Sequence, residues 1–89
     1  MNARKHSALA LLDASTAIEA LSPAVGEEKA RAAVEAAIDV LSLDARRLTR
    51  DDVLRVLERI AQAKGVVGVC ARFARSRLIL QWASDDYSR

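Results

Sequence analysis

The sequence is poor in the residues that build covalent and metal-based sites. Its 89 residues include a single cysteine, Cys70, and a single histidine, His6. One cysteine excludes an internal disulfide, and one Cys with one His falls short of the common structural zinc sites. Proteins of the reducing cytoplasm lack disulfides. We therefore expect a cytoplasmic protein that binds no metal and no other cofactor.

Aromatic residues are also scarce, since Phe73, Trp82 and Tyr87 are the only three. The chain is 52% hydrophobic, but much of that share is alanine, so a core must depend on Leu, Ile and Val. A chain of this size buries roughly 60–65% of its unfolded surface, which suffices for one small domain. We assign residues 1–82 to that domain and residues 83–89 to a polar, flexible tail. No apolar run approaches the about 20 residues that cross a bilayer, so no membrane contact is expected.

Catalytic constellations are missing as well. His6 lies beside basic residues, and no serine or threonine is spaced with a second histidine or a lysine that would activate it. The pairs Asp51-Asp52 and Asp85-Asp86 have no third ligand at a metal-binding spacing. We therefore expect that the protein is not an enzyme and has no small-molecule substrate.

Apolar spacing predicts two helices in the first half, over about residues 3–21 and 27–45. Ser22-Pro23 should end the first helix, because the residue before proline avoids helical geometry. Glu27 and Glu28 suit the first turn of the second helix. The predicted buried stripes are Leu11, Ala14, Ile18 and Leu21 in the first helix, and Ala30, Val34, Ala37, Ile38 and Leu41 in the second.

A third helix, over about residues 50–64, has the clearest boundaries. Thr49 is a good N-cap, and Leu48 before it can pack on Val53 as a hydrophobic staple. Gly65 is suited to the left-handed conformation that ends many helices. Val53, Leu57 and Ile60 should form the buried stripe.

Residues 66–82, "VVGVCARFARSRLILQW", fit two structures. As a hairpin of strands 66–73 and 78–82, one antiparallel register pairs apolar residues throughout: Phe73 with Leu78, Ala71 with Leu80, and Val69 with Trp82. The β-branched content and Gly68, which is weak inside a helix, also favour strands. We therefore predict an α+β fold of three helices and a C-terminal β-hairpin. The alternative is an all-α four-helix bundle, in which residues 66–82 form a helix with the face Val67, Cys70, Ala71, Ala74, Leu78 and Trp82.

Positive charge gathers in one part of the chain. The net charge is only +2, yet residues 46–77 carry nine Lys or Arg against three Asp or Glu. Helices followed by a hairpin with a basic tip resemble the order of elements in winged-helix DNA-binding domains. We therefore predict DNA binding, of the kind seen in transcription regulators, through Arg46, Arg47, Arg55, Arg59, Arg72, Arg75 and Arg77.

A second interpretation needs no nucleic acid. A chain this small has a thin stability margin, and a lone two-stranded hairpin leaves edges that must be covered. Both points favour a homodimer or a partner protein, with the chain acting as an adaptor or regulatory protein. If residues 66–82 form a helix, this second function becomes the stronger prediction.

Overall fold

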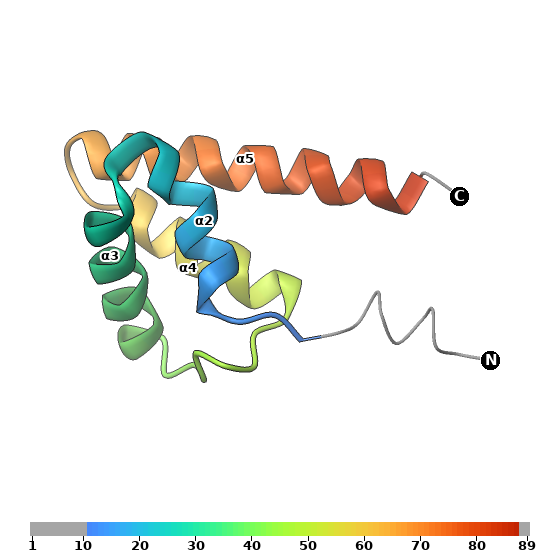
Figure 1. The fold of residues 1–89 in the computed structure, drawn as a ribbon, viewed down its shortest axis with the longest axis horizontal. Helices are drawn as coiled ribbons and strands as arrows, with labels where there is room; N and C mark the ends of the chain where they lie inside the picture. The colour runs from blue at the N-terminus through green and yellow to red at the C-terminus, as the bar shows by residue number, and fades with distance from the viewer. Residues whose placement is uncertain (1–10, 88–89) are drawn as a thin grey trace.

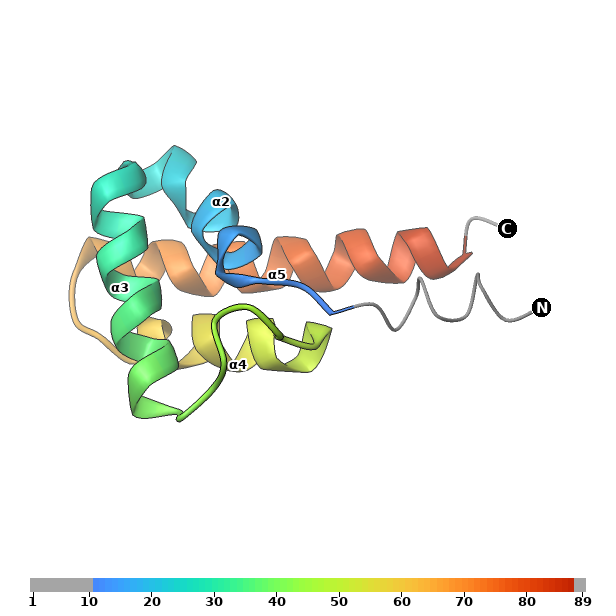
Figure 2. The same ribbon diagram turned by 60° about the horizontal axis from the view of Figure 1, so that its bottom comes forward.

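The computed structural model describes residues 11–87. This part of the chain forms four helices: α2 (Ala14–Val25), α3 (Glu27–Val40), α4 (Arg50–Ala61) and α5 (Val66–Tyr87). The longest helix, α5, lies along one side of the molecule and extends beyond the other three (Figures 1 and 2). It packs against α2 and α4, while α3 packs against α2 and α4 in turn. The four helices therefore enclose one core.

The predicted β-hairpin is wrong, because residues 66–87 form one continuous helix. No strand is present in residues 11–87; the single extended pairing is an isolated antiparallel bridge between Leu12 and Leu48. Its two backbone hydrogen bonds have N···O distances of 2.6 and 2.8 Å. The all-α alternative describes this fold, and the winged-helix order of elements does not.

Two apolar stripes on opposite sides of α5 explain why its sequence looks like strands. Ala71, Ala74 and Leu78 are buried against the other helices. Phe73 and Leu80 lie on the outer side and are exposed. Read along the chain, the two helical stripes interleave and imitate the alternation of a strand, which has a period of two.

The first described helix also departs from its predicted bounds. It begins at Ala14, where the Asp13 carboxylate caps it by accepting from the Ser15 N–H at 3.0 Å. It passes through Pro23 and ends at Val25. Pro23 has no N–H to donate to the carbonyl four residues earlier, yet the helix continues for two residues beyond it. Residues 3–10 of the predicted helix lie outside the described residues.

The second described helix, α3, begins at Glu27 as predicted but ends at Val40 rather than near residue 45. Ser42 has a φ of 57°, a left-handed conformation that breaks the helix. The residues that follow form the turn that leads into α4. Arg46 and Arg47 therefore lie in this connection and not at a helix end.

The start of α4 confirms the predicted N-cap. The Thr49 hydroxyl accepts from the Asp52 N–H at 3.0 Å, and the Asp52 carboxylate accepts from the Thr49 N–H at 3.0 Å. This reciprocal capping box satisfies two backbone donors at once. The helix ends at Ala61, before the predicted residue 64, and Gly65 adopts a φ of 93° in the turn before α5.

The core draws on α2, on the stripes predicted for α3 and α4, and on a stripe of α5 that includes two alanines; Leu41, predicted to be buried, is half-buried. Leu21, Leu48 and Leu57 are among its largest fully buried side chains. The buried apolar residues are Ala17, Ile18, Leu21, Ala30, Val34, Ala37, Ile38, Leu48, Val53, Val56, Leu57, Ile60, Ala71, Ala74 and Leu78. Leu11, predicted to be buried, is 46% exposed. Because α5 buries two alanines, its backbone can approach the other helices closely.

Removal of the α4 cap gives a modest, local prediction. Thr49→Ala should lower the free energy of unfolding by about 1 kcal/mol, because the Asp52 N–H loses its acceptor. Urea denaturation would measure the change. Thr49→Ser retains the hydroxyl and should stay close to wild type; equal losses in the two variants would contradict a capping role.

Candidate interaction surface

The seven arginines predicted to bind DNA lie on three separate parts of the fold. Arg46 and Arg47 are exposed in the connection between α3 and α4. Arg55 and Arg59 are exposed on α4, and Arg55 lies 3.8 Å from the Asp52 carboxylate. This pair is solvent-accessible and therefore contributes little to stability.

The three arginines of α5 do not form the basic hairpin tip that the sequence suggested. Arg72 is exposed, but the Arg77 guanidinium turns toward α2, where it donates to the Ala20 carbonyl at 2.9 Å. Arg75 is half-buried, and its Nε is buried without a hydrogen-bond partner among the described residues. Arg77 is therefore exposed but tied to α2 by a hydrogen bond, and Arg75 is half-buried.

Arg50, which is outside the set of seven predicted arginines, contacts the C-terminal half of α5. The Arg50 guanidinium lies 5.1 Å from the centre of the Trp82 ring, a cation–π contact. Its Nη1 is 3.4 Å from the Asp86 carboxylate. The start of α4 thus contacts the C-terminal part of α5. Residues 83–87, which the sequence analysis assigned to a flexible tail, continue this helix.

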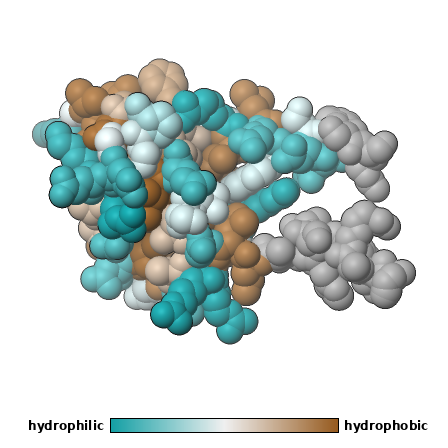
Figure 3. Space-filling model, viewed as in Figure 1, coloured by the Kyte–Doolittle hydropathy of each residue, from teal (hydrophilic) through white to brown (hydrophobic). Residues whose placement is uncertain are grey.

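The feature that sequence reasoning missed is a row of exposed apolar side chains on the outer side of α5. Val66 and Leu80 are each 70% exposed, and Phe73 is 65% exposed. Hydrophobic atoms at the molecular surface are visible in Figure 3 along the upper edge, where α5 lies. We call this row the α5 seam; its members, all exposed, are Val66, Val69, Phe73, Ser76, Leu80 and Ala83.

The spacing of the α5 seam is that of a coiled-coil interface. Successive members are alternately three and four residues apart, which is the a/d pattern that lets one helix pack along another. Four of the six are Val, Phe or Leu, and the other two are the small residues Ser76 and Ala83. This spacing was present in the sequence, but the buried stripe of the same helix concealed it.

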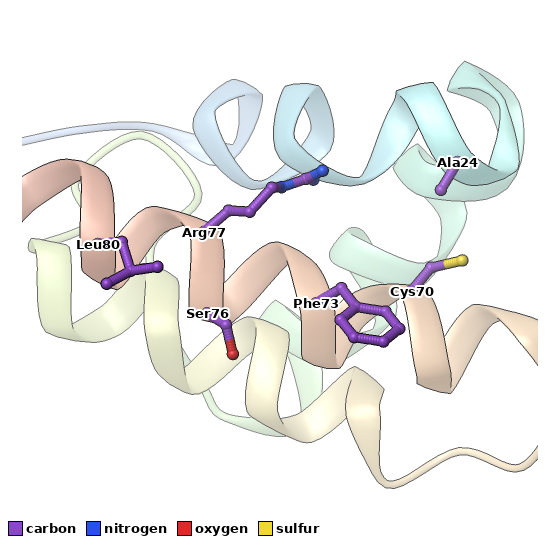
Figure 4. A pocket seen from close by; sticks show the side chains of 6 residues that line it. All are labelled: Ala24, Cys70, Phe73, Ser76, Arg77 and Leu80. Atoms are coloured by element: carbon purple, nitrogen blue, oxygen red, sulfur yellow. The ribbon is translucent and has the colours of Figure 1, made fainter.

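A hollow of about 420 Å³ lies beside the middle of the seam. Figure 4 shows Phe73, Ser76 and Leu80 along α5, with the Arg77 side chain reaching toward α2. The remaining lining comes from Ala24, at the end of α2, and from half-buried Cys70. The surface beside the seam is therefore a shallow apolar groove with one basic side chain at its edge.

Among residues 11–87, no three His, Cys, Asp or Glu side chains gather where they could hold a metal ion. None of the helices described is both long and apolar enough to cross a bilayer.

Comparison of the chain with models of protein families, with curated proteins and with solved structures finds no match. The α5 seam must therefore be interpreted from its own geometry and chemistry.

Proposed function

We propose that this chain is a protein-interaction module, an adaptor or regulatory protein without catalytic activity, which binds its partner through the α5 seam. The observation that carries this proposal is the exposure of Val66, Phe73 and Leu80 on one side of a single helix. Soluble domains rarely leave a contiguous apolar patch uncovered unless it binds something. A row at a/d spacing is what another helix packs onto.

The electrostatics support this function over nucleic-acid binding. Phosphate contact requires several free cations on one face, whereas Arg75 is half-buried and the exposed Arg77 is hydrogen-bonded to α2. On α4, the exposed carboxylates of Asp51 and Glu58 lie on the same helix as Arg55 and Arg59. DNA binding stays a prediction, and the test below includes it as the alternative outcome.

The proposed location is the cytoplasm. Cys70 is a free, half-buried thiol, which the reducing cytoplasm maintains without difficulty. An interaction module that depends on an apolar seam needs no disulfide to function there.

The proposed function predicts that partner binding depends on Leu80. Affinity purification of the tagged chain from its source cells should retain specific proteins, copies of the chain itself included, and Leu80→Glu should abolish that retention. A carboxylate in the seam would have to be buried unpaired when a partner binds. Val40→Glu, which alters another exposed apolar residue, on α3 (57% exposed), is the matched control. Retention of the same proteins by Leu80→Glu as by the wild type would contradict the proposal.

A DNA titration tests the alternative. Binding of the wild-type chain to an arbitrary duplex should be no tighter than about 10⁻⁴–10⁻⁶ M near physiological salt, the range of non-specific contact. Fluorescence anisotropy at about 50 and 200 mM salt would measure it. Tight binding that falls steeply with salt and is lost in Arg46→Ala/Arg47→Ala would favour a nucleic-acid function instead.

A further inference from the structure

We infer that the occupant of the α5 seam is a second copy of the same chain, with the two α5 helices packed antiparallel in one defined register. This inference rests on the proposed function, because it assumes that the seam is an interaction surface. It goes further by naming the partner, the orientation and the residue pairs.

The seam is complementary to itself when one copy is reversed. In antiparallel coiled coils an a residue of one helix faces a d residue of the other. One register pairs every member of the seam with another member. It sets the two small residues, Ser76 and Ala83, opposite larger side chains. Its layers are Val66 against Ala83, Val69 against Leu80, and Phe73 against Ser76, each formed twice by symmetry.

The residues beside the seam select the antiparallel orientation. In a parallel pair, the flanking positions would set Arg72 of one copy against Arg77 of the other, on both sides of the interface. Such like-charge contacts are unfavourable. The antiparallel pair places Arg72 beside Ile79 and Arg77 beside Cys70 instead. It therefore separates the arginines from one another.

Charge at the ends of α5 favours the same orientation. In this register, Asp85 of one copy lies level with Lys64 of the other, just before the N-terminus of its α5. Both residues are exposed in the single chain. A carboxylate is favoured near the positive end of a helix dipole as well as near a lysine. The reversed pair thus brings the acidic end of each α5 to the basic end of the other.

The available area is sufficient for such a dimer. Val66, Val69, Phe73, Ile79 and Leu80 are the large apolar side chains that α5 exposes. From their exposed fractions, they present roughly 500 Å² per copy, or about 1,000 Å² for the pair, which reaches the lower limit of a specific interface. The flanking arginines and the groove beside Phe73 add to this area. A weak, concentration-dependent dimer is expected.

The mass of the chain in solution provides the first arm of the test. Analytical ultracentrifugation should give twice the 9.7 kDa of one chain at high concentration. Leu80→Glu should raise the dimer dissociation constant by about 100-fold or more, because each interface would bury two unpaired carboxylates. Val40→Glu should leave the constant unchanged. Ser76→Glu, at a position that is already polar and exposed, is a second seam variant; it leaves the buried core unchanged and should also weaken the dimer.

Cross-linking provides the second arm and tests the register. In a Cys70→Ala background, a mixture of the Val69→Cys and Leu80→Cys chains should form a cross-linked dimer with a short bismaleimide. Val69→Cys alone should not, because the two copies of residue 69 would lie about 16 Å apart along the helices at 1.5 Å per residue. Cross-linking of Val69→Cys to itself would indicate a parallel pair and overturn the inference.

The two proposals fail in different ways. A chain that stays monomeric at high concentration, or a dimer that Leu80→Glu leaves intact, overturns the self-association. If purification from source cells still retains another protein in a Leu80-dependent manner, the proposed function stands. If no Leu80-dependent partner is retained either, both are wrong.

Discussion

Replacing Leu57 with alanine is expected to lower the free energy of unfolding by about 3 kcal/mol. Leu57 is fully buried in the middle of α4, and α4 packs against α2, α3 and α5. The substitution therefore removes apolar contacts and leaves a cavity where several helices meet. Small domains are stable by only about 5–15 kcal/mol, so much of the folded population would be lost on mild heating.

Urea denaturation followed by circular dichroism would measure this loss. Leu54→Ala is the matched control, since it makes the same chemical change at a half-buried position one turn earlier in the same helix. Its cost should be about 1 kcal/mol, because less of the side chain leaves water on folding. Equal costs for the two variants would show that Leu57 is not the centre of the core.

Gly68→Ala is expected to destabilise the protein by about 2 kcal/mol, the cost of overpacking. On helix propensity alone the opposite is expected, since alanine is favoured over glycine by about 1 kcal/mol inside a helix. A Cβ at Gly68, however, would lie 1.9 Å from the Ala63 carbonyl oxygen. Because that oxygen belongs to the backbone of the turn between α4 and α5, either the turn or the helix must shift.

The reverse substitution provides the comparison for Gly68. Ala32→Gly, at an exposed position inside α3, should cost about 1 kcal/mol from propensity alone. Unfolding free energies of both variants can be read from the same urea titrations. Stabilisation by Gly68→Ala would mean that the turn does not approach α5 as closely as described.

Local chemistry explains which elements the sequence could predict. The start of α4 depends on groups within four residues of Thr49. The Thr49 side chain accepts a hydrogen bond from the Asp52 backbone, and the Asp52 side chain accepts one from the Thr49 backbone. The stripe of α3 predicted to be buried includes Val34 and Ile38, which are buried. Each element has one apolar face and a chemical signal at its start, so pattern and structure agree.

The errors lie where tertiary contacts outweigh local preference. Glycine weakens a helix, so Gly68 favours a strand on local preference, yet in the structure it admits the Ala63 carbonyl. Pro23 was expected to end a helix that continues to Val25. In α5, a second apolar stripe that no other described helix covers concealed the helical period of the first.

Tertiary contacts also explain why the predicted arginine site differs from the α5 seam seen in the structure. The positions of the arginines in the chain are known from the sequence, but the directions of their side chains depend on the fold: Arg72 and Arg77 are both exposed, yet Arg77 bonds to α2. The α5 seam could be found only after the buried face of α5 was known. Any of its residues, such as Phe73, would otherwise be assigned to the core.

By itself, the sequence determined that helices begin near residues 27 and 50, because capping groups and one-sided apolar stripes act within a few residues; their predicted ends, about 45 and 64, lie beyond the observed ends at 40 and 61. Only the tertiary structure decided the state of residues 66–87. Their β-branched and aromatic side chains are compatible with either state, and burial of Ala71 and Ala74 against the other helices selects the helix. In the helix, Phe73 and Leu80 point outward and form part of the α5 seam, whereas the predicted hairpin would have buried them.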